Sequence, residues 1–429
     1  PEGFAATQFD MHVAEVIGLY KFDILSQRGL GHIKEAVEIV KANKGIDIDI
    51  TPVEQFKKDP LLNQNLLKGN TIGCFYIESP AMRSLLNKLL CDNYLTLVAA
   101  SSIIRPGVAQ SGMMDEYIRR HRFPEHRKKI HPVMGDIMPD TYGVMVYQED
   151  VIKVAHYFAK LTLSEADVLR RGMSGKSRSK DEFQRIKQKF HANCTDLNYS
   201  KELIADVWHQ IESFAGYSFA KGHSASYAVE SYQSLYLKTY YPLEFMVAVV
   251  NNFGGFYTAE LYLHEAKKAG AHIEAPCINK SNYTTCIYGT VIYVGFIHIT
   301  GLENNVAERI LAERLANGPF VDFDDFMMRV AINLEQLEIL ITINAFRISG
   351  IKKRELLIEA YRRLNKSKKT QPAATLFHTG APTPYQFPEL HLDNREDAWD
   401  EIKILGFPLS SPFDLIDDPL INNRRLVRV

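Results

Sequence analysis

Cysteine is scarce in this sequence of 429 residues, and its five copies form no CxxC pair. That number and spacing predict reduced thiols in the cytoplasm, with neither a disulfide framework nor a zinc site. No apolar run approaches the roughly 20 residues that a membrane-spanning helix needs, and no signal peptide is visible. We therefore expect a cytoplasmic protein with no membrane partner, and a first residue other than Met suggests a piece of a longer chain.

Net charge is also nearly absent, because 50 Lys and Arg residues oppose 51 Asp and Glu residues. The whole chain therefore lacks the positive charge typical of a nucleic-acid binder, although a local cluster can supply it. A hydrophobic content of 46% and a charged content of 24% are typical of a folded globular protein. The length predicts about two to four domains.

Apolar residues recur at helical spacing over most of the chain, so the expected fold class is mainly α and multidomain. Glycine and serine interrupt the pattern at 172–177, and a Gly-Gly pair does so at 254–255. Residues 366–392 have the Lys, Thr, Pro and Ala content of a linker. Helices are expected at 29–45, in the first part of 107–131, and at 143–171, 181–191, 200–214, 224–250 and 301–365, and short strands at 14–25, 71–77 and 271–300.

The first expected strand contains the stretch GLYKFDIL, in which Lys21 and Asp23 interrupt an otherwise apolar run. Side chains alternate between the two faces of a strand, so these two charges share one face. One interpretation is a structural ion pair at a sheet edge. The other is a joint site for phosphate and Mg²⁺, since Mg²⁺ prefers carboxylate oxygens and a lysine suits phosphate oxygens.

Positive charge gathers in two segments, opposed in the second only by Asp181 and Glu182. Such clusters attract polyanions, because each neutralised phosphate releases counterions. The alternative is an ordinary solvated helix face. The Gly/Ser loop within the second segment favours a triphosphate cradle, although no GxxxxGK[ST] loop is present. The first cluster comprises Arg119, Arg120, Arg122, Arg127, Lys128 and Lys129, and the second Arg170, Arg171, Lys176, Arg178, Lys180, Arg185, Lys187 and Lys189.

A third motif, FAKGHSASYA at 219–228, places Lys221, His223 and Ser224 at an expected helix start. Backbone amides at a helix N-terminus lack helical partners, so the position favours an anion. A nucleophilic serine is the weaker alternative, because no acidic partner lies at a suitable spacing from the His-Ser pair.

Taken in order, these pieces resemble motifs of the C-family bacterial replicative polymerases, the DNA polymerase III alpha subunits. The resemblance runs in register over nearly the whole chain. It is carried by TQFD at 7–10 with GLYKFDIL at 18–25, FYIES at 75–79, RPGVAQSG at 105–112, TYGVMVYQE at 141–149, LRRGM at 169–173 and FAGYSFAKGHSASYA at 214–228.

The resemblance implies a role for each candidate residue. Asp23 matches a metal-binding catalytic aspartate of the palm, and Lys21 matches a palm lysine that meets the incoming triphosphate. Arg170 and Arg171 match finger arginines that hold this triphosphate, near Lys176. The remaining nucleotide-pocket candidates are Arg105, Lys221, His223 and Ser224. The implied reaction is attack of a primer 3′-hydroxyl on the α-phosphate of a dNTP with two Mg²⁺ ions, in the presence of primer-template DNA and other replisome subunits.

The resemblance also implies a division of the chain: 1–28 palm remnant, 29–270 fingers, 271–365 helix-hairpin-helix region, 366–392 linker with a candidate clamp peptide, and 393–429 start of the next domain. The paired aspartates of the family lie upstream of this sequence, so we expect the chain alone to be inactive. The alternative is a non-catalytic DNA-binding and clamp-docking scaffold. An independent metal-dependent phosphohydrolase lacks enough carboxylates. Departures from the family pattern, such as Tyr76 in place of Gln, are compatible with an error-prone branch.

The C-terminal third offers two further candidate sites. Residues 299–304 resemble a helix-hairpin-helix turn, which presents backbone amides to DNA phosphates, while Glu303 in that turn would repel them. Residues 334–346 resemble a second hairpin, with Asn344 where glycine is usual, and plain helix packing is the alternative for both. In the linker, Leu376 and Phe377 resemble the end of a sliding-clamp-binding peptide, or else pack back on the domain. The DNA-binding candidates are the first basic cluster, Arg178, Lys180, Gly301 and Asn304.

Overall fold

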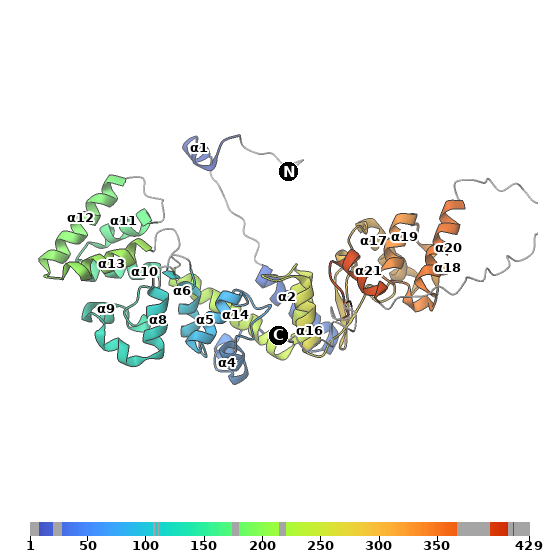
Figure 1. Cartoon of the computed structure of the whole chain (residues 1–429), viewed down its shortest axis with the longest axis horizontal. Helices are drawn as coiled ribbons and strands as arrows, with labels where there is room; N and C mark the ends of the chain where they lie inside the picture. Colours follow the sequence, from blue (N-terminus) through green and yellow to red (C-terminus); the bar gives the residue numbers. More distant parts are fainter. Residues whose placement is uncertain are drawn as a thin grey trace, which may run out of the picture.

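A computed structural model describes residues 8–19, 28–105, 108–109, 111–173, 180–213, 220–366, 395–410 and 415. Helices make up most of this part of the chain, and they are accompanied by one three-stranded sheet (Figure 1). The prediction of a mainly α, multidomain protein is therefore confirmed. None of the helices in the described ranges is long and apolar enough to cross a membrane.

Several of the helices that precede the sheet are bounded by capping side chains or by proline. Asp59, Ser79 and Asn93 each accept hydrogen bonds from backbone N–H groups of the helix that follows them, which fixes where these helices begin. They are α1 (Met11–Val16), α2 (Arg28–Lys44), α3 (Val53–Phe56), α4 (Pro60–Leu67), α5 (Pro80–Leu89), α6 (Tyr94–Ile103), α8 (Met113–Arg122), α9 (Pro132–Ile137), α10 (Gln148–Lys153), α11 (Leu163–Met173), α12 (Lys180–Asp196), α13 (Lys201–Ser213), α14 (Lys221–Tyr240), α15 (Pro242–Asn251) and α16 (Ala259–Lys268).

The strand expected at 14–25 is wrong where the structure tests it. Residues 14–16 belong to the short helix α1, because Asp10 caps it: its carboxylate accepts the N–H of Val13 at 2.9 Å and its carbonyl the N–H of Ala14 at 2.9 Å. Residues 20–27, with Lys21 and Asp23, lie outside the described residues. The extended segment expected to carry these two charges therefore stays a prediction.

The strand expected at 71–77 is also wrong, because this segment is a buried series of turns. Its backbone groups are paired by side chains instead of by a neighbouring strand. The Glu78 carboxylate accepts the N–H of Gly73 at 2.8 Å, the Ser234 hydroxyl accepts that of Phe75 at 3.2 Å, and the Thr71 hydroxyl donates to the Ile77 carbonyl at 2.5 Å. An apolar run of this length predicts burial but does not predict a strand.

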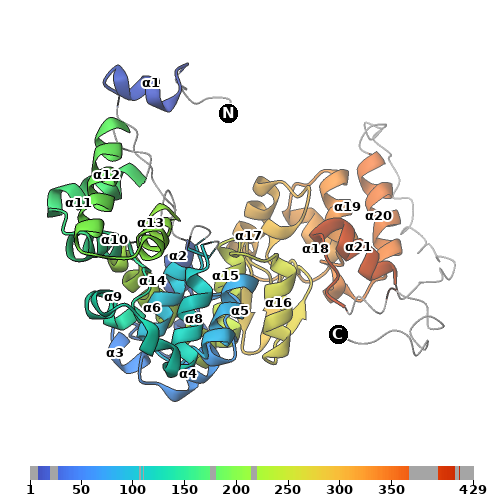
Figure 2. The ribbon, with the colours of Figure 1, turned by 60° about the vertical axis from the view of Figure 1, so that its left-hand side comes forward.

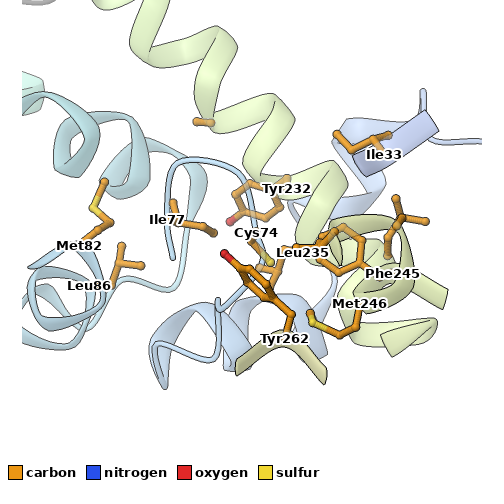
Figure 3. Packing of buried hydrophobic residues seen from close by; sticks show 14 of the residues in the cluster. Ile33, Cys74, Ile77, Met82, Leu86, Tyr232, Leu235, Phe245, Met246 and Tyr262 are labelled. Carbon is orange, nitrogen blue, oxygen red and sulfur yellow. The ribbon is translucent and has the colours of Figure 1, made fainter. Parts of the chain in front are cut away.

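The long helix α14 lies at the centre of the first part of the molecule and packs against α2, α3, α4, α6 and α15. Figure 2 shows these helices grouped around it. In Figure 3, Tyr232 and Leu235 of α14, with Phe245 and Met246 of α15, surround the turn that carries Cys74. The helix expected at 224–250 is divided into α14 and α15 at Pro242, which has no N–H to continue the first helix and is suited to start the second.

Helices α11, α12 and α13 form a neighbouring unit that follows a π-helical turn, η3 (Val154–Phe158). Aromatic rings pack together within this unit: the ring centroids of Phe158 and Tyr199 are 4.5 Å apart, and those of Phe190 and Trp208 are 5.2 Å apart. The helix expected at 143–171 is interrupted between η3 and α11, where Lys160 has a left-handed backbone (φ 53°).

The strands expected within 271–300 are confirmed. β1 (His272–Glu274), β2 (Cys286–Tyr288) and β3 (Val291–Tyr293) form a sheet of order β1-β3-β2, with β1 parallel and β2 antiparallel to β3. The side chain of Asn43 on α2 accepts the N–H of Gly289 at 2.7 Å and donates to its carbonyl at 3.0 Å. The β2–β3 turn is thereby fastened to the first part of the molecule.

Five α-helices follow the sheet in the described residues, and the first four of them lie in the region where helices were expected, 301–365. The last one, α21, packs against α19 and buries Ala398, Ile404 and Leu405. The predicted start of a new domain at 393 stays a prediction, and the described part of that segment lies on the preceding helices. The five are α17 (Asn304–Asn317), α18 (Phe323–Arg329), α19 (Leu334–Thr342), α20 (Lys353–Lys366) and α21 (Glu396–Leu405).

Candidate nucleotide and nucleic-acid site

The structure places only part of the predicted site. The described candidates lie at the end of α6 (Arg105), on α8 and the following 3₁₀ turn (the first basic cluster), on α11 (Arg170, Arg171), at the start of α14 and at the start of α17. Six of the predicted residues lie outside the described ranges: Lys21, Asp23, Lys176, Arg178, Leu376 and Phe377.

Arg170 and Arg171 lie in the last turn of α11 and share one carboxylate, Asp167. The Arg170 Nε and Nη2 atoms lie 2.9 and 2.8 Å from Asp167 Oδ1, and the Arg171 Nε atom lies 2.9 Å from Oδ2. The side chains of the two arginines are 29% and 56% exposed. Ion pairs this accessible to water contribute at most about 1 kcal/mol, so another anion can replace Asp167 at little cost.

The start of α14 already has an anion, which is the Glu149 carboxylate. Its two oxygens accept the backbone N–H of Lys221 at 3.1 and 3.0 Å. The Lys221 ammonium lies 3.1 Å from Asp140 and 5.4 Å from the centroid of the Tyr147 ring. The helix start predicted from the sequence is confirmed, and its preference for negative charge is met within the protein.

Ser224 faces the interior, whereas His223 is exposed. The Ser224 hydroxyl oxygen lies 2.6 Å from that of Ser102, and this buried hydrogen bond joins α14 to α6. In this arrangement the hydroxyl supports helix packing, while its role as a nucleotide ligand stays a prediction.

Arg105 lies beside a cluster of tyrosines that the sequence reasoning did not assemble. Its guanidinium carbon is 5.5 Å from the Tyr76 ring centroid, and the Tyr76 and Tyr227 centroids are 5.0 Å apart. The Tyr76 hydroxyl donates to the Ser101 carbonyl at 3.1 Å, its backbone is left-handed (φ 63°), and burial raises the pKa of its phenol. Because Tyr227 follows His223 on α14, the cluster brings Arg105 and the α14 motif to one place.

The first basic cluster serves largely to hold its own segment together. Arg120 contacts Glu116 at 2.6 Å and donates to the Tyr142 carbonyl at 2.7 Å. Arg127 donates to the Arg120 carbonyl at 2.7 Å and lies over the Tyr142 ring at 4.0 Å. Arg120 and Arg127 are thus half-buried in their own segment, which differs from the solvated helix face given as the alternative, and their DNA contacts stay predictions. Arg119, Arg122 and Lys128 keep exposed side chains and stay predicted DNA contacts. Of Lys129 and Lys180 the structure describes only the backbone.

The helix-hairpin-helix turn is present and is satisfied internally. Gly301 has the positive φ (82°) that the turn requires, and the Gln336 amide donates to its carbonyl at 2.8 Å. The same Gln336 side chain accepts the N–H of Glu303 at 2.7 Å, and Asn304 Oδ1 accepts the Tyr283 hydroxyl at 3.0 Å. DNA contacts by Gly301 and Asn304 therefore stay predictions. The Gly301 carbonyl and Asn304 Oδ1 are already hydrogen-bonded, so such contacts would use other atoms of these residues.

The acidic partners of the candidate cations are the residues that the sequence reasoning missed. Asp167 precedes the twin arginines by three and four positions, which is a spacing that pairs charges on one helix face. The pairing of Asp167 with the two arginines could therefore have been predicted from the sequence. Glu149 and Asp140 lie far from Lys221 in the sequence, and no pattern links them.

The described residues do not include a complete set of Mg²⁺ ligands. Asp23, its predicted ligand, lies outside the described ranges. The residues that the structure does describe contain no group of three or more His, Cys, Asp or Glu side chains that could hold a metal ion. The described side chains by themselves therefore do not fit a two-metal centre.

Comparison with known proteins identifies relatives of both parts of the chain. Residues 29–198 match a family described as the bacterial DNA polymerase III alpha subunit finger domain, and residues 270–356 match the helix-hairpin-helix motif. DNA polymerase III subunit alpha of Aquifex aeolicus (strain VF5) is 32% identical over 431 residues, covering 100% of this chain and 35% of that protein. The same subunit of Staphylococcus aureus (strain COL) is 36% identical over 361 residues, covering 82% of this chain and 33% of that protein.

These matches confirm the resemblance seen in the sequence motifs. The finger match contains Arg105, Arg170 and Arg171, and the helix-hairpin-helix match contains the turn at Gly301. The chain spans about a third of the length of the curated relatives that it matches. Over that length, the chain belongs to the bacterial DNA polymerase III alpha subunit family.

Proposed function

We propose that the chain takes part in template-directed DNA synthesis, as the fingers and helix-hairpin-helix region of an alpha subunit. The reaction is nucleotidyl transfer from a dNTP to a primer 3′-hydroxyl, with pyrophosphate as the leaving group. The observation that carries the proposal is the arginine pair in the last turns of α11, which shares the 39% exposed carboxylate of Asp167, an ion-pair partner that another anion can replace.

In this proposal the protein side chains bind and orient the triphosphate. Arg170 and Arg171 exchange Asp167 for triphosphate oxygens, for which a planar guanidinium is well suited. Lys221 leaves Asp140 and adds a further cation, and Arg105 adjoins the first turns of α14 through the tyrosine cluster. Fixing these charges before reaction lowers the cost of the developing negative charge.

Mg²⁺ would activate the primer hydroxyl and offset the charge of the leaving pyrophosphate when bound. We propose Asp23 as one of its ligands. One carboxylate cannot hold two metal ions, and the described residues provide no cluster of three ligands. We therefore expect this chain alone not to extend primers.

The partners follow from the same proposal. Primer-template DNA would contact the exposed cations of the first basic cluster, together with Arg178 and Lys180, and other replisome subunits would be near neighbours in the cytoplasm. We also propose that Leu376 and Phe377 bind a sliding clamp. The double variant Leu376→Ala/Phe377→Ala should lower clamp affinity at least tenfold by surface plasmon resonance, and an unchanged affinity would remove the clamp from the proposal.

The test of the triphosphate site is dNTP binding by calorimetry. The variant Arg170→Ala/Arg171→Ala should weaken affinity by tenfold or more, because a hydrogen bond to a charged group contributes about 1.5–3 kcal/mol. Arg185→Ala is the matched control, since it removes an exposed arginine of the same cluster. An equal loss in the control would show that general positive charge, and not a site, binds the nucleotide.

The second candidate is a non-catalytic DNA-binding and clamp-docking scaffold. It is favoured by the acids Asp167, Glu149 and Asp140, which already neutralise the candidate nucleotide ligands. Joining this chain to a segment with the family's paired aspartates distinguishes the two. A polymerase would then extend primers and lose that activity on Asp23→Ala, whereas a scaffold would bind DNA with a salt-sensitive affinity and stay inert.

A further inference from the structure

The connection between α15 and α16 exposes two phenylalanines on either side of a Gly-Gly pair. The side chains of Phe253 and Phe256 are 65% and 61% exposed. Phe253 also adopts a left-handed backbone (φ 61°) at the end of α15, where glycine or asparagine is usual. A large apolar side chain held in a strained position and turned to water is unexpected unless it has a partner.

The backbone beneath these rings is held firmly. The buried Glu78 carboxylate accepts the N–H of Phe256 at 2.5 Å and the hydroxyl of Tyr262 at 2.9 Å. The Tyr262 oxygen in turn accepts the N–H groups of Gly255 at 2.9 Å and Tyr257 at 3.1 Å. Figure 3 shows Tyr262 next to the buried turn with Cys74 and Ile77. The backbone that carries Phe256 is therefore anchored to the core.

One arginine lies near each of the two phenylalanines. Arg28 at the start of α2 donates to the Phe253 carbonyl at 3.5 Å and is otherwise exposed. Phe256 and Arg105 line one cavity of about 450 Å³, together with Tyr76, Glu78, Ser79, Met82, Ile104 and Gly255. Of the acids nearby, Glu78 is engaged by the hydrogen bonds above, and Glu260 on α16 is the exposed one.

Exposed rings on a rigid backbone, flanked by arginines, match the chemistry of single-stranded nucleic acid. Every base has a flat face that stacks on an aromatic ring, and arginine pairs with the phosphates. A duplex hides those faces, so only unpaired bases can use the rings. We propose that Phe253 and Phe256 form a stacking platform for unpaired bases of the template strand, with Arg28 and Arg105 next to its phosphates. The choice of DNA template rests on the function proposed above.

The test measures binding of fluorescent oligo(dT) and of primer-template duplex to the 429-residue chain. Phe253→Ala and Phe256→Ala should each weaken oligo(dT) affinity on the order of tenfold, the scale of one base–ring stack. Affinity for a blunt duplex should stay within about twofold. Phe253→Gly should lose oligo(dT) affinity to the same degree while holding or raising the unfolding temperature, since glycine relieves the left-handed strain.

Two controls separate stacking from other effects. Tyr288→Ala removes a ring that is 50% exposed on β2, and it should leave oligo(dT) binding unchanged. Phe256→Leu keeps apolar area but no ring, so it should resemble Phe256→Ala. Wild-type oligo(dT) affinity in both alanine variants would overturn the platform, and would point to a protein partner in the adjoining apolar hollow lined by Leu261 and Phe407. If the wild-type chain bound neither primer-template duplex nor dNTP, this result would instead refute the proposed function.

Discussion

Glu230 on α14 and His32 on α2 are two buried ionisable side chains that titrate in opposite directions. Among the described residues, neither His32 ring nitrogen nor Glu230 Oε1 has a hydrogen-bond partner. Burial raises the pKa of Glu230 from 4.5 to about 7. Burial, and then the charge of Arg28, lower the pKa of His32 from 6.5 to about 4. Each group is therefore neutral in the folded protein over a range in which it is charged in the unfolded chain.

The wild-type protein should lose stability as the pH rises because Glu230 is buried, and the variant Glu230→Gln should not show this loss. Between pH 4.5 and about 7 the unfolded chain releases the Glu230 proton and the folded protein keeps it, so the free energy of unfolding falls as the pH rises. At pH 8 we expect the variant to be more stable by up to about 3 kcal/mol. Urea denaturation at a series of pH values measures the difference.

His32 provides the control for this prediction. Its stabilising contribution is lost as the pH falls from 6.5 through about 4, which is the opposite slope. The two contributions oppose each other in the wild-type protein between pH 4.5 and 6.5. His32→Asn should therefore show a steeper fall in stability with rising pH than the wild type does. Parallel profiles for the wild type and Glu230→Gln would contradict the buried, protonated state of Glu230.

Gln336 on α19 links two consecutive helical hairpins through a single side chain. It is 3% exposed, and its amide group both donates to the Gly301 carbonyl and accepts the Glu303 N–H. The neighbouring turn at Asn344 has a left-handed backbone (φ 60°), which agrees with the expectation that this residue stands where glycine is usual. The turn geometry was thus readable from the sequence, but the residue that locks it was not.

The variant Gln336→Ala should destabilise the protein by about 1–3 kcal/mol, because it leaves a carbonyl and an N–H of the turn without their partner. Thermal unfolding measures this effect. Gln210→Ala, which removes an exposed hydrogen bond to Asp206, is the matched control and should change stability by less than about 0.5 kcal/mol. If the two variants unfold at the same temperature, the turn does not depend on Gln336.

The helix α21 closes the described structure by packing on the helices before it. The Lys353 side chain on α20 is 11% exposed, and its ammonium lies 2.6 Å from both Asp397 and Asp400. Arg354 adds a contact to Glu396 at 2.9 Å, and the Thr300 N–H donates to the Ile404 carbonyl at 2.9 Å. These contacts tie the start of α21 to the first turn of α20, and the end of α21 to the residue before the Gly301 turn.

Lys353→Ala should release α21, since removing one partner of a mostly buried ion pair leaves the other uncompensated. We expect a loss of about 2 kcal/mol locally, less than for a fully buried pair because Asp397 is 63% exposed. Hydrogen exchange in 396–405 should speed up by about tenfold or more. Lys352→Ala, an exposed neighbour, should leave exchange unchanged, and equal exchange in both variants would count against the ion-pair clasp.

Local spacing was enough to predict most helices, the strands within 271–300 and the start of α14, because propensity, periodicity and turn chemistry act between near neighbours. The resemblance to a helix-hairpin-helix motif predicted the turn at Gly301. Family motifs then indicated which residues to examine. The contacts between residues far apart in the sequence became known only from the tertiary structure. Lys221 meets Asp140 across 81 residues, and Phe256 meets Glu78 across 178. Such contacts depend on how distant elements come together, so whether a candidate cation is paired, buried or open to a ligand is a property of the folded arrangement.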